Sequence, residues 1–223
     1  WFVLFWNWNY PHFQPHRNVK VAQEFRLYLR RLTLMPLQAL ERMIASHRIR
    51  SGSFPYHIAL LQLEHDSSFQ AHGAFETQEE FVAYVIEAFA AGAAAHHHLV
   101  FKAHPLEDGR SPLRRDIKQH AQSQGIADRV HFVRGGKLAG LLNNARSAVT
   151  VNSTSGQQVL WRGLPLRVFG TAIYAKPELV SSQPLAAFFA KPAPQPSARA
   201  GLTAAIEVSH ALEQFSRPLS SDA

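Results

Sequence analysis

The sequence predicts an α/β protein built on a Rossmann-like, doubly wound parallel sheet. Two observations support this fold class. Short apolar segments rich in β-branched residues alternate with segments of helical periodicity, as in successive βαβ units. The first of these apolar segments, residues 56–63, is almost continuously apolar, which is typical of a central parallel strand covered on both faces. We therefore expect residues 53–192 to form one Rossmann-like domain with right-handed crossovers between its strands.

A helical segment is predicted before this domain. Residues 19–50 carry apolar side chains at roughly helical spacing, and the sequence SGSFP at residues 51–55 ends the pattern. Seven arginines lie between Arg17 and Arg50 and make the other face basic. A solvated face explains them, and so does a linker helix near an anionic membrane or acceptor. The sequence starts with Trp1 rather than methionine, so we expect residues 1–52 to be the remnant of an amino-terminal domain and a basic linker helix.

The elements of the sheet domain follow one another regularly. A T-x-x-E capping box at Thr77 and Glu80 predicts a helix that ends at Gly92. The later strands are predicted at residues 99–103, 130–133, 148–151 and 166–169, and the later helices at 112–124, 137–145, 156–162 and 185–190. Residues 193–223 begin with a segment rich in Pro, Ala and Ser, and we expect a poorly ordered or loosely docked tail.

The composition narrows the classes of partner and chemistry. With 23 Lys and Arg against 16 Asp and Glu, the net charge of +7 favours anionic partners, although solubility alone also explains it. The absence of cysteine excludes disulfides and thiolate chemistry and is consistent with the cytoplasm. The aromatic and apolar opening of the chain is too short for a membrane span.

Polar side chains follow three of the predicted strands, in the segments 62–68, 102–107 and 152–156. Ligands of open parallel sheets bind beyond the carboxyl ends of the strands, so the convergence of these three segments predicts a binding site. The third segment runs into a helix start, where free backbone N–H groups favour phosphate or carboxylate. The catalytic candidates are Asp66, Glu64 and His104, and the nucleotide-binding candidates are Lys102, His104, Pro105, Asn152, Ser153, Thr154, Ser155 and Gly156.

Each candidate also has a purely structural interpretation. Asp66 can cap a loop, and His104 before a proline can be a turn residue. Ser155 and Gln158 match the S-x-x-Q capping pattern, although capping and phosphate binding use the same N-terminal donors and are compatible.

Other kinds of site are not expected. Residues 96–98 are three consecutive histidines entering a strand, and neighbouring side chains there point to opposite faces, so we expect no metal site. The sequence has no G-x-G-x-x-G, no P-loop and no G-x-S-x-G elbow. The aromatic residues fall mainly within apolar segments, so nucleic acid is not an expected partner.

The three polar strand ends, with Gly163-Leu164-Pro165 and the segment 168–174, resemble the capsule polysaccharide biosynthesis and export family of the KpsS/LipB type. The resemblance covers residues 48–192. It implies the carboxy-terminal, donor-binding half of a GT-B glycosyltransferase, which transfers β-linked Kdo from CMP-Kdo to a lipid anchor. The His-Pro pair and the downstream Ser/Thr helix start are also similar to bacterial sialyltransferases, which use CMP-sugars.

The resemblance also implies roles and partners. The hydroxyls of residues 153–155 would bind the phosphate with His104, while Asp66, or secondly Glu64, would act as nucleophile or base. No cofactor is expected besides the CMP-Kdo donor. The expected partners are this nucleotide-sugar, a lipid-linked glycan acceptor at the inner membrane surface and a capsule biosynthesis or export complex, with a cytoplasmic or peripheral location. Two alternatives remain open: a non-catalytic capsule glycan binding or export module, and a GT-B-like sugar-nucleotide epimerase.

Overall fold

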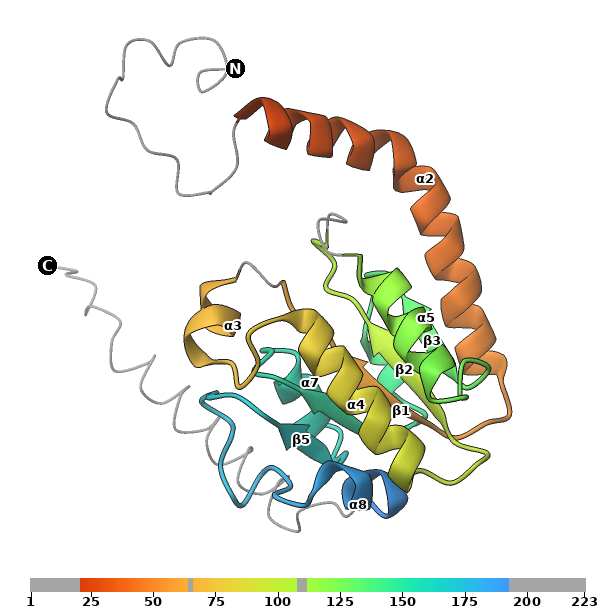
Figure 1. Ribbon diagram of the computed structural model, residues 1–223, viewed down its shortest axis with the longest axis vertical. Helices are drawn as coiled ribbons and strands as arrows, with labels where there is room; N and C mark the ends of the chain where they lie inside the picture. The colour runs from red at the N-terminus through yellow and green to blue at the C-terminus, as the bar shows by residue number, and fades with distance from the viewer. Residues whose placement is uncertain (1–20, 64–65, 108–111, 193–223) are drawn as a thin grey trace, which may run out of the picture.

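A computed structural model of the chain contains a five-stranded, wholly parallel sheet with the strand order β3-β2-β1-β4-β5 (Figure 1). The structure describes residues 21–63, 66–107 and 112–192. The strands are β1 (Tyr56–Leu60), β2 (His98–Lys102), β3 (Val130–Val133), β4 (Ala145–Thr150) and β5 (Leu166–Val168). The prediction of a Rossmann-like parallel sheet is confirmed.

Helices cover both faces of this sheet and place their apolar sides against it. The helices are α2 (Val21–Ser51), α3 (Ser67–His72), α4 (Gln78–Gly92), α5 (Leu113–Ser123), α6 (Ala139–Leu142), α7 (Gly156–Leu160) and α8 (Leu185–Ala190). One face packs on α3, α4, α5 and α8, and the other packs on α6, α7 and the end of α2. Because side chains alternate along a strand, each strand contributes to both apolar layers.

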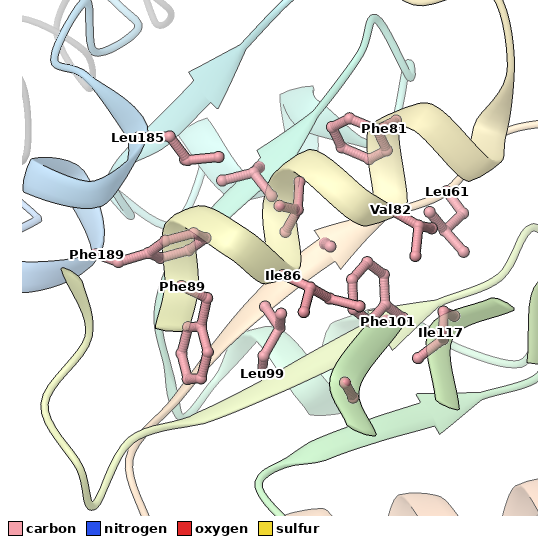
Figure 2. Close-up of a cluster of buried hydrophobic side chains, with 14 of the residues drawn as sticks. Leu61, Phe81, Val82, Ile86, Phe89, Leu99, Phe101, Ile117, Leu185 and Phe189 are labelled. Carbon is pink, nitrogen blue, oxygen red and sulfur yellow. The ribbon is translucent and has the colours of Figure 1, made fainter. Parts of the chain in front are cut away.

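The layer under α4 is the larger of the two and is built around phenylalanines. Phe81 and Phe89 of α4 and Phe101 of β2 are fully buried in it, and Phe189 of α8 closes its far side (Figure 2). Ile58 and Leu60 of β1 point into the opposite layer, so the central strand is buried on both faces. Burial of this kind stabilises the fold by about 25 cal/mol for each Å² of apolar surface.

The helix boundaries confirm most of the sequence prediction, but the helix predicted at residues 137–145 is limited to α6, and β4 already starts at Ala145. Thr77 is the N-cap of α4, and its hydroxyl accepts a hydrogen bond from the backbone N–H of Glu80 at 3.1 Å. The Glu80 carboxylate accepts from the N–H of Glu76 at 2.9 Å, so the return bond of the capping box reaches one residue further back than predicted. The six-residue helix α3 was not predicted, because its sequence follows a polar strand end.

The long helix α2 confirms the helical prediction for residues 19–50 from Val21 onward. It continues through Pro36, and its carboxy-terminal part contacts β3 and α6. Ile49, near its end, is buried in the second apolar layer, whereas most of its large apolar side chains are exposed. None of the described helices is long and apolar enough to cross a membrane. The predicted tail at residues 193–223 lies outside the described residues.

Histidines pair at the amino-terminal ends of the strands. His57 Nε2 lies 3.1 Å from His97 Nδ1, and His57 Nδ1 lies 2.7 Å from the Ser147 hydroxyl. His98 Nδ1 lies 2.8 Å from His131 Nε2. Consecutive histidines 97 and 98 therefore have different partners, as predicted from strand geometry. Within the described residues no group of three or more His, Cys, Asp or Glu is placed to hold a metal ion.

We predict that these histidines make the fold sensitive to acid. Burial, and secondly His97, lowers the pKa of His57 to about 3, while an unfolded histidine has a pKa of about 6.5. The native state keeps His57 neutral, so its stabilising contribution is complete above pH 6.5 and declines as the pH falls toward 3. At pH 5 the loss from His57 is about 2 kcal/mol.

Urea denaturation at pH 7.5 and pH 5.0 measures this loss. His57→Asn removes the titrating ring and should show a smaller decrease between the two pH values than the wild type. His47→Asn, at an exposed position of α2, should keep the wild-type decrease. An unchanged decrease in His57→Asn would contradict the assignment.

Candidate functional site

A cavity of about 370 Å³ opens at the carboxyl ends of the strands, between α6 and the start of α7. The chain leaves β1 toward β2 on one side of the sheet, and β4 flanks β1 on the other. The strand order therefore changes direction between β1 and β4, which is where open α/β sheets bind ligands. The cavity is lined by the ends of β1 and β2, residues 136–139, Ser155 and Gln158.

Lys102, the last residue of β2, supplies a buried cation to this cavity. Alternation along β2 places it on the same face as Val100, and only 5% of it is exposed. Its ammonium group donates a hydrogen bond to the carbonyl oxygen of Ala103 at 3.1 Å. Burial, and secondly the charge of Arg42, lowers the pKa of Lys102 to about 8. The residue is therefore mostly charged at neutral pH and close to its titration range.

His104 lines the same cavity two residues further on. Its Nδ1 accepts a hydrogen bond from the backbone N–H of Leu106 at 3.1 Å, so the neutral ring carries its proton on Nε2. Burial lowers the pKa of His104, the charge of Lys102 lowers it further, and Asp66 partly opposes them. At neutral pH His104 is thus an uncharged hydrogen-bond donor. It serves as a turn residue and lines the cavity, so its two interpretations coexist.

Asn152 is held by a side chain from the end of β1. Gln62 Nε2 donates to Asn152 Oδ1 at 2.6 Å, and the backbone N–H of Asn152 donates to Gln62 Oε1 at 2.9 Å. Gln78 of α4 in turn donates to the Gln62 carbonyl oxygen at 2.7 Å. All three amides are buried, and Asn152 is not a lining residue of the cavity. Asn152 therefore fixes the backbone that leads into residues 153–156.

The segment after Asn152 is organised by its own hydroxyls. Ser153 Oγ accepts a hydrogen bond from the Ser155 N–H at 3.2 Å, and the Tyr174 hydroxyl donates to the Ser153 carbonyl oxygen. Any Cβ at Gly156 would overlap the Tyr174 hydroxyl, so this position requires glycine. Ser155 lines the cavity, whereas Thr154 is exposed and is not a lining residue.

The predicted capping pair of Ser155 and Gln158 is wrong. Ser155 is the N-cap of α7 but already has helical dihedral angles, φ −62° and ψ −17°, and its side chain makes no cap hydrogen bond. An N-cap hydroxyl accepts from a backbone N–H two or three residues ahead, and the N-cap residue typically has an extended conformation when it does so. Both side chains instead line the cavity, which frees Ser155 for a ligand.

The structure describes one of the two predicted carboxylates, Asp66. Asp66 is exposed and is not a lining residue, although its charge reaches His104. Glu64 lies outside the described residues. Pro105 lines the cavity beside His104. The predicted nucleotide-binding and catalytic roles of all these residues stay predictions.

Sequence reasoning missed the loop that forms the opposite wall. Gly136 and Lys137 line the cavity, and Gly135 and Gly136 both have positive φ, at 55° and 79°. A Gly-Gly pair one residue after a predicted strand and directly before a lysine was the available signal. Lys137 adds a second cation to the cavity.

Comparison with known proteins identifies relatives of the chain. The model of the family described as capsule polysaccharide biosynthesis protein matches residues 3–214. The capsule polysaccharide export protein KpsS of Escherichia coli is 27% identical over 179 residues, which are 78% of this chain and 46% of that protein. The capsule polysaccharide modification protein LipB of Neisseria meningitidis is 30% identical over 194 residues, 83% of this chain and 45% of LipB. The chain thus spans less than half the length of these relatives.

Solved structures of similar layout match less closely. The β-Kdo 2,7 transferase KpsC of Thermosulfurimonas dismutans gives a TM-score of 0.44 at 14% identity, covering 78% of this chain and 63% of that one. The UDP-GlcNAc 2-epimerase of Neisseria meningitidis, bound to UDP-GlcNAc, gives a TM-score of 0.39 at 12% identity, covering 84% and 45%.

We predict that anion binding in the cavity weakens at alkaline pH. With the pKa of Lys102 at about 8, anion affinity should fall by about tenfold for each pH unit above that value. His104, with its lowered pKa, stays neutral throughout this range. The thermal stabilisation by sulfate over chloride, at equal ionic strength between pH 7 and 9.5, measures the effect. Lys102→Arg should stay flat because guanidinium remains charged, and a parallel decline in that variant would exclude Lys102 as the cause.

Proposed function

Because the chain belongs to the capsule polysaccharide biosynthesis protein family, we propose that it is the donor-binding domain of a GT-B glycosyltransferase. The reaction proposed is transfer of Kdo from CMP-Kdo to a lipid-linked acceptor. The observation that supports it most directly is the cavity at the strand switch point, where Lys102, His104 and Ser155 meet. None of the described residues that line this cavity is a carboxylate, and buried Lys102 supplies a cation to it.

The chemistry of a CMP-sugar suits these side chains. CMP leaves with negative charge on its single phosphate, and groups that hold this charge accelerate departure. Lys102 would supply the cation, the His104 Nε2–H and the Ser155 hydroxyl would donate hydrogen bonds, and Lys137 faces the same space. The helix dipole of α7 would contribute little, because this helix has only five residues. In this proposal the main phosphate ligands are therefore side chains, rather than the free backbone N–H groups at the start of α7.

Carboxylates outside the cavity wall would act at the sugar. Asp66 follows β1 and is close enough to His104 to influence its titration, which suits a nucleophile or a base toward the acceptor hydroxyl. Glu64 is the second candidate. The proposal places the protein in the cytoplasm or on the inner membrane surface, within a capsule biosynthesis or export complex, with no cofactor besides the donor.

A second candidate function follows from the names of the relatives. One relative is described as an export protein and another as a modification protein. A non-catalytic module would recognise capsule glycan without a nucleotide, so nucleotide binding distinguishes the two functions.

We predict that CMP stabilises the full-length protein against heat more than UMP, UDP or ADP does. A ligand at 100 times its Kd adds about 2.7 kcal/mol to the free energy of unfolding. His104→Ala should weaken CMP binding without unfolding the protein, because the side chain is only partly buried at a strand end. His47→Ala is the matched control, because it removes the same side chain at an exposed position of α2 that does not line the cavity.

Three results would count against the proposal. Equal stabilisation by all nucleotides would remove the preference for CMP. A preference for UDP would favour an epimerase, and no stabilisation by any nucleotide would favour the binding module.

We further predict that Asp66→Asn in the full-length protein leaves CMP binding close to normal and lowers transfer by orders of magnitude. The amide keeps the size and hydrogen bonding of the carboxylate but cannot act as nucleophile or base, so the loss should appear mainly in kcat. Glu64→Gln should have a milder effect. The reverse order would exchange the two roles, and full activity in both variants would place the catalytic carboxylate elsewhere in the protein.

A further inference from the structure

A second cavity, of about 260 Å³, lies between α2 and α6 beside the first. The two cavities share Gly136, Lys137 and Ala139, so one short segment of chain forms a wall of both. The rest of the second cavity is lined by residues of α6 and by residues of α2, among them Arg42, Ser46 and Arg50.

Cations dominate this second cavity. Arg42, Arg50 and Lys137 line it, and among its described lining residues there is no carboxylate. Glu41, the acid beside Arg42 in the sequence, forms an ion pair with Arg114 of α5. The positive charge of the cavity is therefore not offset by an acidic lining side chain.

The backbone is shaped to bring these cations together. Gly136, with φ at 79°, has the Arg42 side chain directly against it, because a Cβ built there would lie 2.6 Å from Arg42 Cδ. A side chain at this position would displace Arg42. Arg42 is also close enough to Lys102 to lower its pKa, so the cations of the two cavities influence one another. Gathering like charges in this way costs free energy, which a bound anion would offset.

We propose that the second cavity is an anion subsite that binds a carboxylate or phosphate group next to the nucleotide phosphate in the first. The ligand chemistry is thus a pair of anionic groups held by adjoining sites. This proposal rests on the proposed function, which supplies the nucleotide site in the first cavity and the two candidate sources of the second anion.

Two sources can supply the second anion. Kdo is a sugar acid, so the donor itself carries a carboxylate besides its phosphate. The lipid-linked acceptor is the other source, through a phosphate of its anchor.

Arg50→Gln tests the subsite, since Arg50 lines only the second cavity. Arg48→Gln is the matched control, because it removes the same charge from the same exposed last turn of α2 and lines neither cavity. The full-length protein is titrated calorimetrically with CMP, with CMP-Kdo, and with glycerol 3-phosphate in the presence of saturating CMP.

We expect Arg50→Gln to bind CMP as the wild type does. Its affinity for either CMP-Kdo or glycerol 3-phosphate should be about tenfold lower or more, as expected for loss of a charge-assisted contact. If Arg50→Gln no longer binds CMP-Kdo more tightly than CMP, the second anion is the donor carboxylate. Loss of glycerol phosphate binding identifies an acceptor phosphate. Arg48→Gln should match the wild type with all three probes.

Other outcomes separate the two proposals. Wild-type binding of all three probes by Arg50→Gln would overturn the subsite and leave the nucleotide site intact. An equal loss of CMP itself would also overturn it, because the two cavities would then be a single site. If CMP fails to bind the wild type while glycerol phosphate binds in an Arg50-dependent way, the subsite stands and the proposed function fails.

Discussion

Two hydrogen bonds between Gln62 and Asn152 connect the segments that follow β1 and β4. The position of the backbone that leads to the candidate site depends on them. At a switch point the segments that leave neighbouring strands diverge, so the backbone groups between them lose their sheet partners. The Gln62 amide replaces those partners, and Gln78 ties the same residue to α4. This fixes the start of the segment that leads to Ser155, which lines the cavity together with Lys102. Amide side chains suit this position because they satisfy both donors and acceptors without adding charge.

The stability of the domain and its candidate function reside in different parts of the structure. The apolar layers on the two faces of the sheet are continuous and contain little charge. The site, in contrast, gathers Lys102, Lys137 and Arg42 around a loop of two glycines with positive φ. Such a group of cations is unfavourable by itself and persists because the sheet and its helices hold the elements in place.

The sheet could be predicted from the sequence because its signals are local. Apolar runs, a capping box and glycines after helices mark the elements wherever they lie in space. The Gln62–Asn152 pair could not be predicted, since 90 residues separate its partners. The same applies to the approach of Arg42 to Lys102. The prediction of a Ser155 side-chain cap is wrong for a different reason. The sequence matches the S-x-x-Q pattern, but the backbone at Ser155 is already helical and its side chain makes no cap hydrogen bond.

The exposed apolar side chains of α2 have a consequence for the handling of the protein. Among the side chains of this helix that the structure describes, eight large apolar ones between Phe25 and Ile44 are about half or more exposed. Exposed apolar side chains in this number favour self-association in solution. Removing the helix would reduce this tendency but would also delete Arg42 and Arg50 from the wall of the second cavity. A shortened protein without α2 would therefore aggregate less, but it would lack two of the cations that line the second cavity.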